Sequence, residues 1–141
     1  MTDLTDLALR TADMCDLAIK AAAKAESALS VEDDLTAKQA VDHARLLAQA
    51  VHVFARDLRI RARAVEASIA VQAATARTLT FADMAVQSVE AFAVATWADD
   101  MGQCPVPLCT QAELAAEAVR DAQSTRLFAD LAAVVTEEER V

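Results

Sequence analysis

One stretch of the chain, from Val31 to Arg77, contains neither glycine nor proline and carries apolar residues at helical spacing along its whole length. Projected onto an α-helix, these residues form a heptad seam with alternating steps of three and four. Many of them are small, so a partner helix can approach closely. We therefore expect one long central helix over this stretch. Its seam comprises Val41, Ala44, Ala48, Val51, Ala55, Leu58, Ala62, Val65, Ile69 and Ala76.

The rest of the surface of this expected helix is also largely apolar. Leu46, Val53, Ile60 and Ala67 lie on another side, and a helix that is apolar almost all round is typically buried among others. An unbroken helix of this length would measure about 70 Å, which is too long for its neighbours to cover. We therefore expect either a kink near Arg59–Arg63 or an overhang that pairs with a second chain.

The composition favours helices throughout. The chain has 141 residues, of which one is glycine and two are proline, and aromatic residues make up 4%. Further helices are expected over Asp3–Leu29, over Phe81–Asp100 with Thr80 as its N-cap, and from a capping box at Thr110 to about Val135. We predict an all-α protein, an antiparallel four-helix bundle with one long central helix. Residues 1–141 form a single domain with a short acidic tail at 136–141.

A narrow polar face runs along the central stretch, and it is mainly basic although the net charge of the chain is −9. The segments on either side are acidic, so the simplest interpretation is charge complementarity between packed helices. The alternative is a surface that binds an anion, an acidic protein or another copy's acidic helix. An acidic chain is a poor candidate for nucleic-acid binding. The candidate partner- or anion-binding residues are Arg45, His52, Arg56, Arg59 and Arg63.

The clearest loop is Met101–Cys109, which contains the only glycine, both prolines and two of the three cysteines. Cys104 and Cys109 are the candidate redox or metal residues, because two thiols in a stiff loop can form a reversible disulfide or bind a metal or haem. The spacing differs from the common zinc-binding C-x₂-C, and an incidental role is the simplest interpretation. Cys15, alone in an apolar helix, is expected to be inert.

The two histidines do not predict a metal site. His43 and His52 are nine residues apart on one expected helix, so they face nearly opposite sides and cannot share a metal within one chain. Neither follows a glutamate at the Glu-x-x-His spacing of di-iron bundles. We expect neither a di-metal centre nor a cofactor.

Arg45 and His52 are separated by six residues, a spacing that resembles the Arg–His motif of HEPN-domain ribonucleases, which are also all-α. The resemblance implies that Arg45 stabilises phosphate charge and that His52 acts as a general acid or base. The family motif usually has a polar residue after the arginine, whereas Leu46 follows Arg45 here.

The start of the chain lacks the basic segment and apolar core of a signal peptide, and no apolar run approaches the length of a membrane span. We therefore expect a cytoplasmic homo-oligomer. Its expected function is non-enzymatic, as an assembly, adaptor or regulatory protein that acts through helix packing. The alternatives are a HEPN-like ribonuclease, a thiol redox or metal protein, and a bundle whose alanine-rich core leaves a cavity for an apolar ligand.

Overall fold

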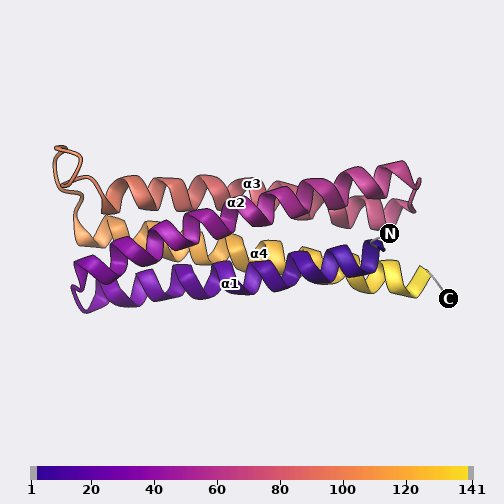
Figure 1. Cartoon of the computed structure of the whole chain (residues 1–141), viewed down its shortest axis with the longest axis horizontal. Coiled ribbons are helices and arrows are strands. Elements are labelled where there is room, and N and C mark those ends of the chain that lie inside the picture. Colours follow the sequence, from indigo (N-terminus) through magenta and orange to yellow (C-terminus); the bar gives the residue numbers. More distant parts are fainter. Residues whose placement is uncertain (1–2, 140–141) are drawn as a thin grey trace.

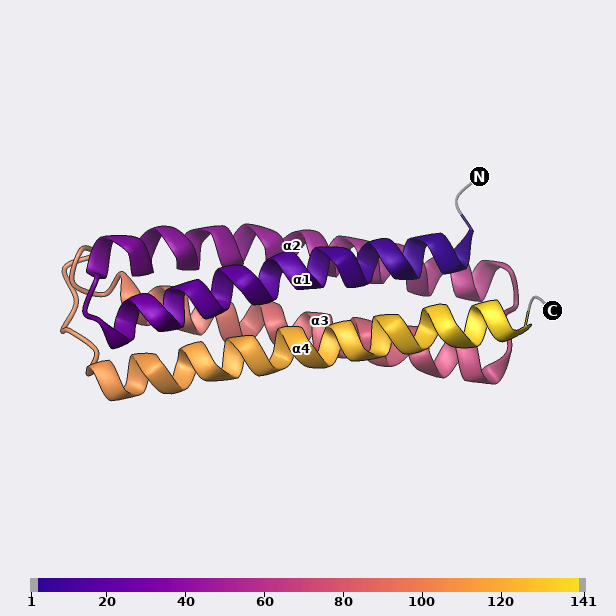
Figure 2. The same ribbon diagram turned by 90° about the horizontal axis from the view of Figure 1, so that it is seen from below.

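The computed structural model describes residues 3–139, which form four α-helices packed as an antiparallel bundle (Figures 1 and 2). The helices are α1 (Leu4–Ser30), α2 (Asp34–Ala64), α3 (Ile69–Thr96) and α4 (Leu108–Glu139). Each helix packs mainly against the next in the cycle α1, α2, α3, α4, so α2 lies diagonally opposite α4. The predicted all-α four-helix bundle is confirmed. None of the helices within the described residues is long and apolar enough to cross a membrane.

The prediction of one helix over Val31–Arg77 is wrong. α2 ends at Ala64, the chain reverses direction, and α3 begins at Ile69. The expected seam is buried from Val41 to Ala62, but Val65 is 63% exposed and Ile69 is 90% exposed. The structure therefore has no overhanging rod, and this reason for expecting a second chain no longer applies.

The reversal after α2 forms without glycine or proline. The Ala67 N–H donates to the Ala62 carbonyl at 3.0 Å, and the Glu66 N–H donates to the Arg63 carbonyl at 3.1 Å. This pair of hydrogen bonds is the Schellman motif, which places one residue in the left-handed region. Glu66 is that residue, with φ of 51°. Ser68 then caps α3 by accepting a hydrogen bond from the Val71 N–H, so both helix ends are satisfied.

The same motif joins α1 to α2. Glu32 has φ of 57°, and the Asp33 N–H donates to the Ala28 carbonyl at 2.9 Å. Asp33 is also the N-cap of α2, and its hydrogen bond from Thr36 lowers the pKa of its carboxyl group. Both turns contain a Val-Glu dipeptide, at Val31 and at Val65, but a third one at Val89 lies inside α3, so the dipeptide alone does not predict a turn.

The predicted start of the third helix is also wrong. α3 begins at Ile69, so Thr80 lies inside the helix, where its hydroxyl donates to the Ala76 carbonyl at 3.0 Å. A threonine inside a helix can donate to the carbonyl four residues earlier, although the residue type is more strongly favoured at an N-cap. The local N-cap pattern at Thr80 was therefore misleading.

The last helix is longer at both ends than the sequence indicates. It begins at Leu108, before the expected cap at Thr110, so Cys109 belongs to its first turn and not to the preceding loop. It continues through Glu139, so the described part of the predicted acidic tail is helical. Arg140 and Val141 lie outside the described residues.

The core is built mainly from alanine. Most of the buried apolar residues are alanines, and the largest fully buried side chains include Phe92, Leu58 and Val41. Buried threonines fit into this core because their hydroxyls donate to the carbonyl four residues earlier, as Thr11 does to Leu7 at 2.8 Å. Small side chains therefore allow the helices to pack closely along their whole length.

Replacing Glu66 by glycine tests the turn between α2 and α3. Glycine adopts a left-handed backbone without the steric cost that glutamate bears. We expect Glu66→Gly to raise the free energy of unfolding by about 0.5–1 kcal/mol, measured by urea denaturation.

The matched control is Glu117→Gly, at an exposed position inside α4. There glycine should lower the free energy of unfolding by about 1 kcal/mol, since it weakens a helix interior. Equal destabilisation by the two substitutions would contradict the assigned turn.

Candidate interaction surfaces

The basic face predicted on α2 lies along the contact between α2 and α3. Arg45 donates from Nε and Nη2 to the two carboxylate oxygens of Glu90 at 2.9 and 3.0 Å. Such two-point pairing fixes the geometry of a guanidinium as well as balancing its charge. The side chains of Arg45 and Glu90 are 40% and 35% exposed. This pair therefore joins the middle of α2 to α3 near the protein surface.

Two more residues of the basic face contact α3. His52 Nε2 contacts the carboxylate of Asp83, and Arg59 donates from Nη1 to the Gln72 carbonyl at 2.9 Å. Charge complementarity between packed helices, the simpler interpretation of the sequence, accounts for these contacts. A partner that binds through Arg45 or His52 would have to compete with Glu90 and Asp83, and such binding stays a prediction.

Arg56 and Arg63 differ from the rest of the basic face. Both are exposed, and within residues 3–139 the structure shows no ion pair for either of them. Arg56 lies three residues after Val53, and Arg63 lies three residues after Ile60, so each arginine neighbours one of these apolar side chains on the helix surface. Positive charge therefore remains available along one part of α2.

An apolar stripe faces outward along α2. Leu46, Val53 and Ile60 are spaced by seven residues and are 67%, 64% and 59% exposed. We call these three residues the outer stripe. The sequence places them together on one side of the helix, but it predicts that neighbouring helices cover that side. A coiled-coil seam has two apolar positions in each heptad. The outer stripe has one, with Ala50 and Asp57 at the positions between its members, so it is an exposed apolar row on which another helix can pack.

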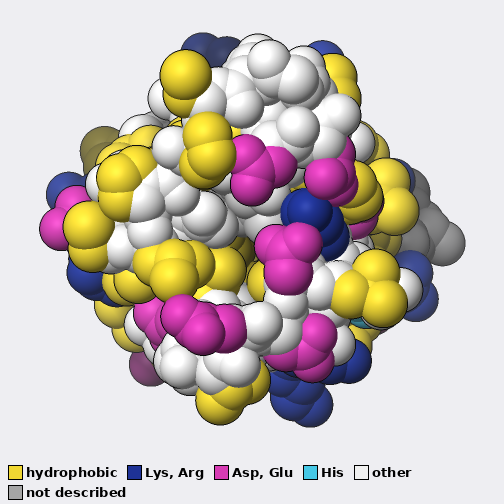
Figure 3. Space-filling model, turned by 90° about the vertical axis from the view of Figure 1, so that its left-hand side faces the viewer, with side chains coloured by type: hydrophobic (Ala, Val, Ile, Leu, Met, Phe, Trp, Pro, Cys, Tyr) yellow, Lys and Arg dark blue, Asp and Glu magenta, His cyan; other side chains and the backbone are white. Residues whose placement is uncertain are grey.

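At the start of α2, the polar face holds the helix to the end of α3. Lys38 is 8% exposed, and its Nζ lies 2.7 Å from Asp34 and 2.9 Å from Asp100. The hydrogen bond to Asp34 has the larger effect on the pKa of Lys38 and the hydrogen bond to Asp100 the smaller, and both raise it. Lys38 also lies over the ring of Trp97, whose indole N–H donates to Asp42 at 3.0 Å. Figure 3 looks onto this end of the bundle, where several acidic side chains lie around one basic side chain near the centre of the view.

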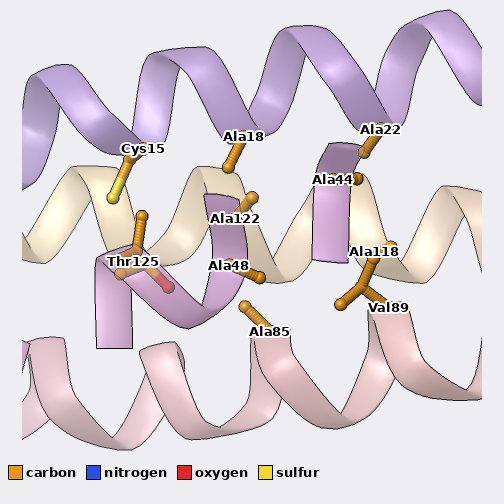
Figure 4. Close-up of a pocket in the computed structure, with 11 residues that line it drawn as sticks. Cys15, Ala18, Ala22, Ala44, Ala48, Ala85, Val89, Ala118, Ala122 and Thr125 are labelled. Atoms are coloured by element: carbon orange, nitrogen blue, oxygen red, sulfur yellow. The ribbon is translucent and has the colours of Figure 1, made fainter. Parts of the chain in front are cut away.

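The centre of the bundle contains a small cavity lined by alanines of all four helices, together with Cys15, Val51, Val89 and Thr125 (Figure 4). The space open to the centre of a water molecule is about 10 Å³. That is at the lower limit for one water molecule and far below the size of a ligand pocket. The alanine side chains point toward one another, so this geometry does not support the apolar-ligand interpretation.

The three cysteines lie in two kinds of surroundings. Cys15 is 1% exposed, and burial, followed by the negative charges of Asp16 and Asp130, raises its pKa to about 12. Cys104 and Cys109 are exposed free thiols, one in the loop and one in α4. Among residues 3–139, no group of three or more His, Cys, Asp or Glu side chains is placed to hold a metal. A redox role for Cys104 and Cys109 stays a prediction.

An open groove lies between the start of α1 and the end of α4, with a volume of about 600 Å³. Its apolar floor includes Leu9 and Val134, which are 47% and 53% exposed. Thr5 is 9% exposed, and its hydroxyl oxygen has no hydrogen-bond partner among the described residues. Helical periodicity in the sequence did not predict this groove. The available signal was that Leu9 and Val134 are large apolar residues outside the buried seams of their helices. Its lining comprises Thr5, Leu9, Ala133, Val134, Glu137 and Glu138.

A double-mutant cycle tests the pairing of Arg45 with Glu90. Because both side chains are more than a third exposed, we expect a coupling energy of only about 0.5–1 kcal/mol between Arg45→Ala and Glu90→Ala. The measurement is urea denaturation at low and high salt, and the coupling should shrink as salt rises. Additive effects of the two substitutions at low salt would show that the pair does not stabilise the bundle.

Thiol titration tests the surroundings of the cysteines. With a pKa of about 12, the Cys15 thiol is ionised in only about one molecule in ten thousand at pH 8. We therefore expect Cys104 and Cys109 to react with a disulfide reagent in the native protein, and Cys15 to react only after unfolding. Variants with Cys104→Ser and Cys109→Ser assign the signals. Rapid native reaction of Cys15 would mean that the bundle centre is open.

No protein-family model, curated protein or solved structure matches this chain. The function is therefore argued from the surfaces themselves. Two surfaces differ from an ordinary helix exterior, namely the outer stripe of α2 with its neighbouring arginines and the groove between α1 and α4.

Proposed function

We propose that this chain is a non-enzymatic helix-packing module that assembles with a partner through the outer stripe of α2. The observation that carries the proposal is the exposure of Leu46, Val53 and Ile60 at heptad spacing on one helix face. Single exposed apolar residues are common on proteins, but a regular apolar row along a helix has the pattern of a helix-binding surface.

The size of α2 supports this proposal. The helix has 31 residues and is therefore about 45 Å long. A stable interface buries about 800 Å² on each partner, and a helix of this length packed against another surface can provide such an area. Arg56 and Arg63 border the stripe, so the preferred partner has acidic residues beside its own apolar surface.

The contacts of Arg45 and His52 favour this proposal over a ribonuclease. In a ribonuclease of the HEPN kind, these two residues would act on a phosphate group. Here each is already in contact with a carboxylate, Glu90 and Asp83 respectively. These carboxylates oppose the approach of an anion to either residue, whereas the outer stripe is open to solvent.

Site-specific photo-crosslinking in the native host tests the proposal. A photoreactive phenylalanine derivative is placed at position 46, 53 or 60, one position at a time. The matched control is position 94, because Val94 on α3 is 61% exposed and Val53 is 64% exposed. We expect crosslinked species from the stripe positions only, since a partner helix excludes water there.

A second substitution checks that crosslinking depends on the apolar surface. Ile60→Asp should abolish crosslinking from position 53, because an unpaired carboxylate is costly to bury. Crosslinking that is equally strong from position 94, or absent from all three stripe positions, would overturn the proposed function.

A further inference from the structure

We propose that the partner of the outer stripe is a second copy of this chain, which binds through its α1–α4 surface. This inference rests on the proposed function and identifies the partner. It specifies an unlike contact, in which α2 of one copy packs into the groove between α1 and α4 of the next.

The α1–α4 surface has an apolar pattern that matches the outer stripe. On α4, Leu127, Leu131 and Val134 are spaced by four and three residues and are 65%, 44% and 53% exposed. Leu9 of α1 lines the groove together with Val134. On α4 the steps of four and three are those of a coiled-coil face, and the outer stripe supplies a large apolar residue at every seventh position to pack against it. We call Leu9, Leu127, Leu131 and Val134 the groove face.

The charges beside the two surfaces are opposite. Arg56 and Arg63 border the outer stripe, whereas Glu137 and Glu138 line the groove. Within the described part of the chain, Arg56, Arg63 and Glu138 have no ion pair. Contact between an outer stripe and a groove face therefore brings arginines near glutamates and lowers the electrostatic energy of both.

Contact between two like surfaces is disfavoured by the same charges. Two outer stripes packed in parallel would bring Arg56 and Arg63 of both copies together. Two groove faces would bring the glutamates together. Like charges across an interface oppose binding, so the charge pattern favours the unlike pair.

A single copy cannot join its own two surfaces. α2 and α4 lie on opposite corners of the bundle, as their packing partners show, and Figure 1 and Figure 2 show the same arrangement. Their outward faces therefore point in opposite directions. After one contact forms, each copy still has one free surface, so further copies add, and the assembly is an open row, or a ring where the rotation between copies closes it, instead of a dimer.

Light scattering on purified variants tests this inference. Val53→Asp damages the outer stripe, and Val134→Asp damages the groove face. Both valines are more than half exposed, so each variant should still fold. Val94→Asp is the control on α3. We expect the unmodified chain and Val94→Asp to form oligomers that grow with concentration. Each of the other two variants alone should remain monomeric, with association weakened more than about 100-fold.

Mixing the two damaged variants gives the decisive result. The Val134→Asp copy has an intact outer stripe, and the Val53→Asp copy has an intact groove face. We therefore expect the mixture to form a one-to-one dimer and nothing larger. Circular dichroism confirms that each variant is folded. If Val53→Asp does not fold, Arg56→Glu replaces it and should weaken association about tenfold by reversing one charge.

The alternatives give different results. If like surfaces pair, one of the two variants will associate as the unmodified chain does, which overturns the unlike contact. If the unmodified chain is monomeric at its solubility limit, the partner is not a second copy, and the inference fails. The proposed function fails separately, because it requires crosslinking at the outer stripe to any partner in the host.

Discussion

The structure depends on close contact between helices through alanine. A buried alanine removes much less apolar surface from water than a buried leucine does. Each buried CH₂ group contributes about 0.8 kcal/mol to the stability of the folded state. The bundle therefore needs long helices, and α1 to α4 contain 27 to 32 residues each. Close approach also explains the very small central cavity. It brings the edges of neighbouring helices close enough for Arg45 on α2 to reach Glu90 on α3 directly.

The same small core leaves many large apolar residues on the outside. Positions between closely packed helices accept alanine, whereas Leu46, Val53 and Ile60 lie on the surface of α2. The side of α2 that faces α3 is polar, and there Arg45 and Arg59 already donate hydrogen bonds to residues of α3. One helix thus has a side that stabilises the bundle and a side with no contact in the monomer. Association through the second side leaves the first undisturbed.

Periodicity predicted which residues share a helix face, but it could not predict where the helices end. From Val41 to Ala62 the buried seam was correct, because one helix face meets the core along that whole length. It failed at Val65, since the Schellman turn places Glu66 in a conformation that usually selects glycine. Nor could periodicity identify which apolar face is exposed, because this depends on the directions in which neighbouring helices pack. The outer stripe was therefore found in the sequence, but its exposure was not.

The uneven charge of the chain connects the fold with its proposed assembly. Part of the positive charge of α2 is balanced inside the monomer, where Glu90 and Asp83 of α3 meet Arg45 and His52. Arg56 and Arg63 remain near the end of α2, and this is the end of the bundle where α4 finishes in three successive glutamates. One of those glutamates, Glu139, already accepts a hydrogen bond from Ser68, in the connection that follows α2. In the proposed assembly, Glu138 of a second copy would lie near these arginines and repeat the acid–base pairing that joins α2 to α3.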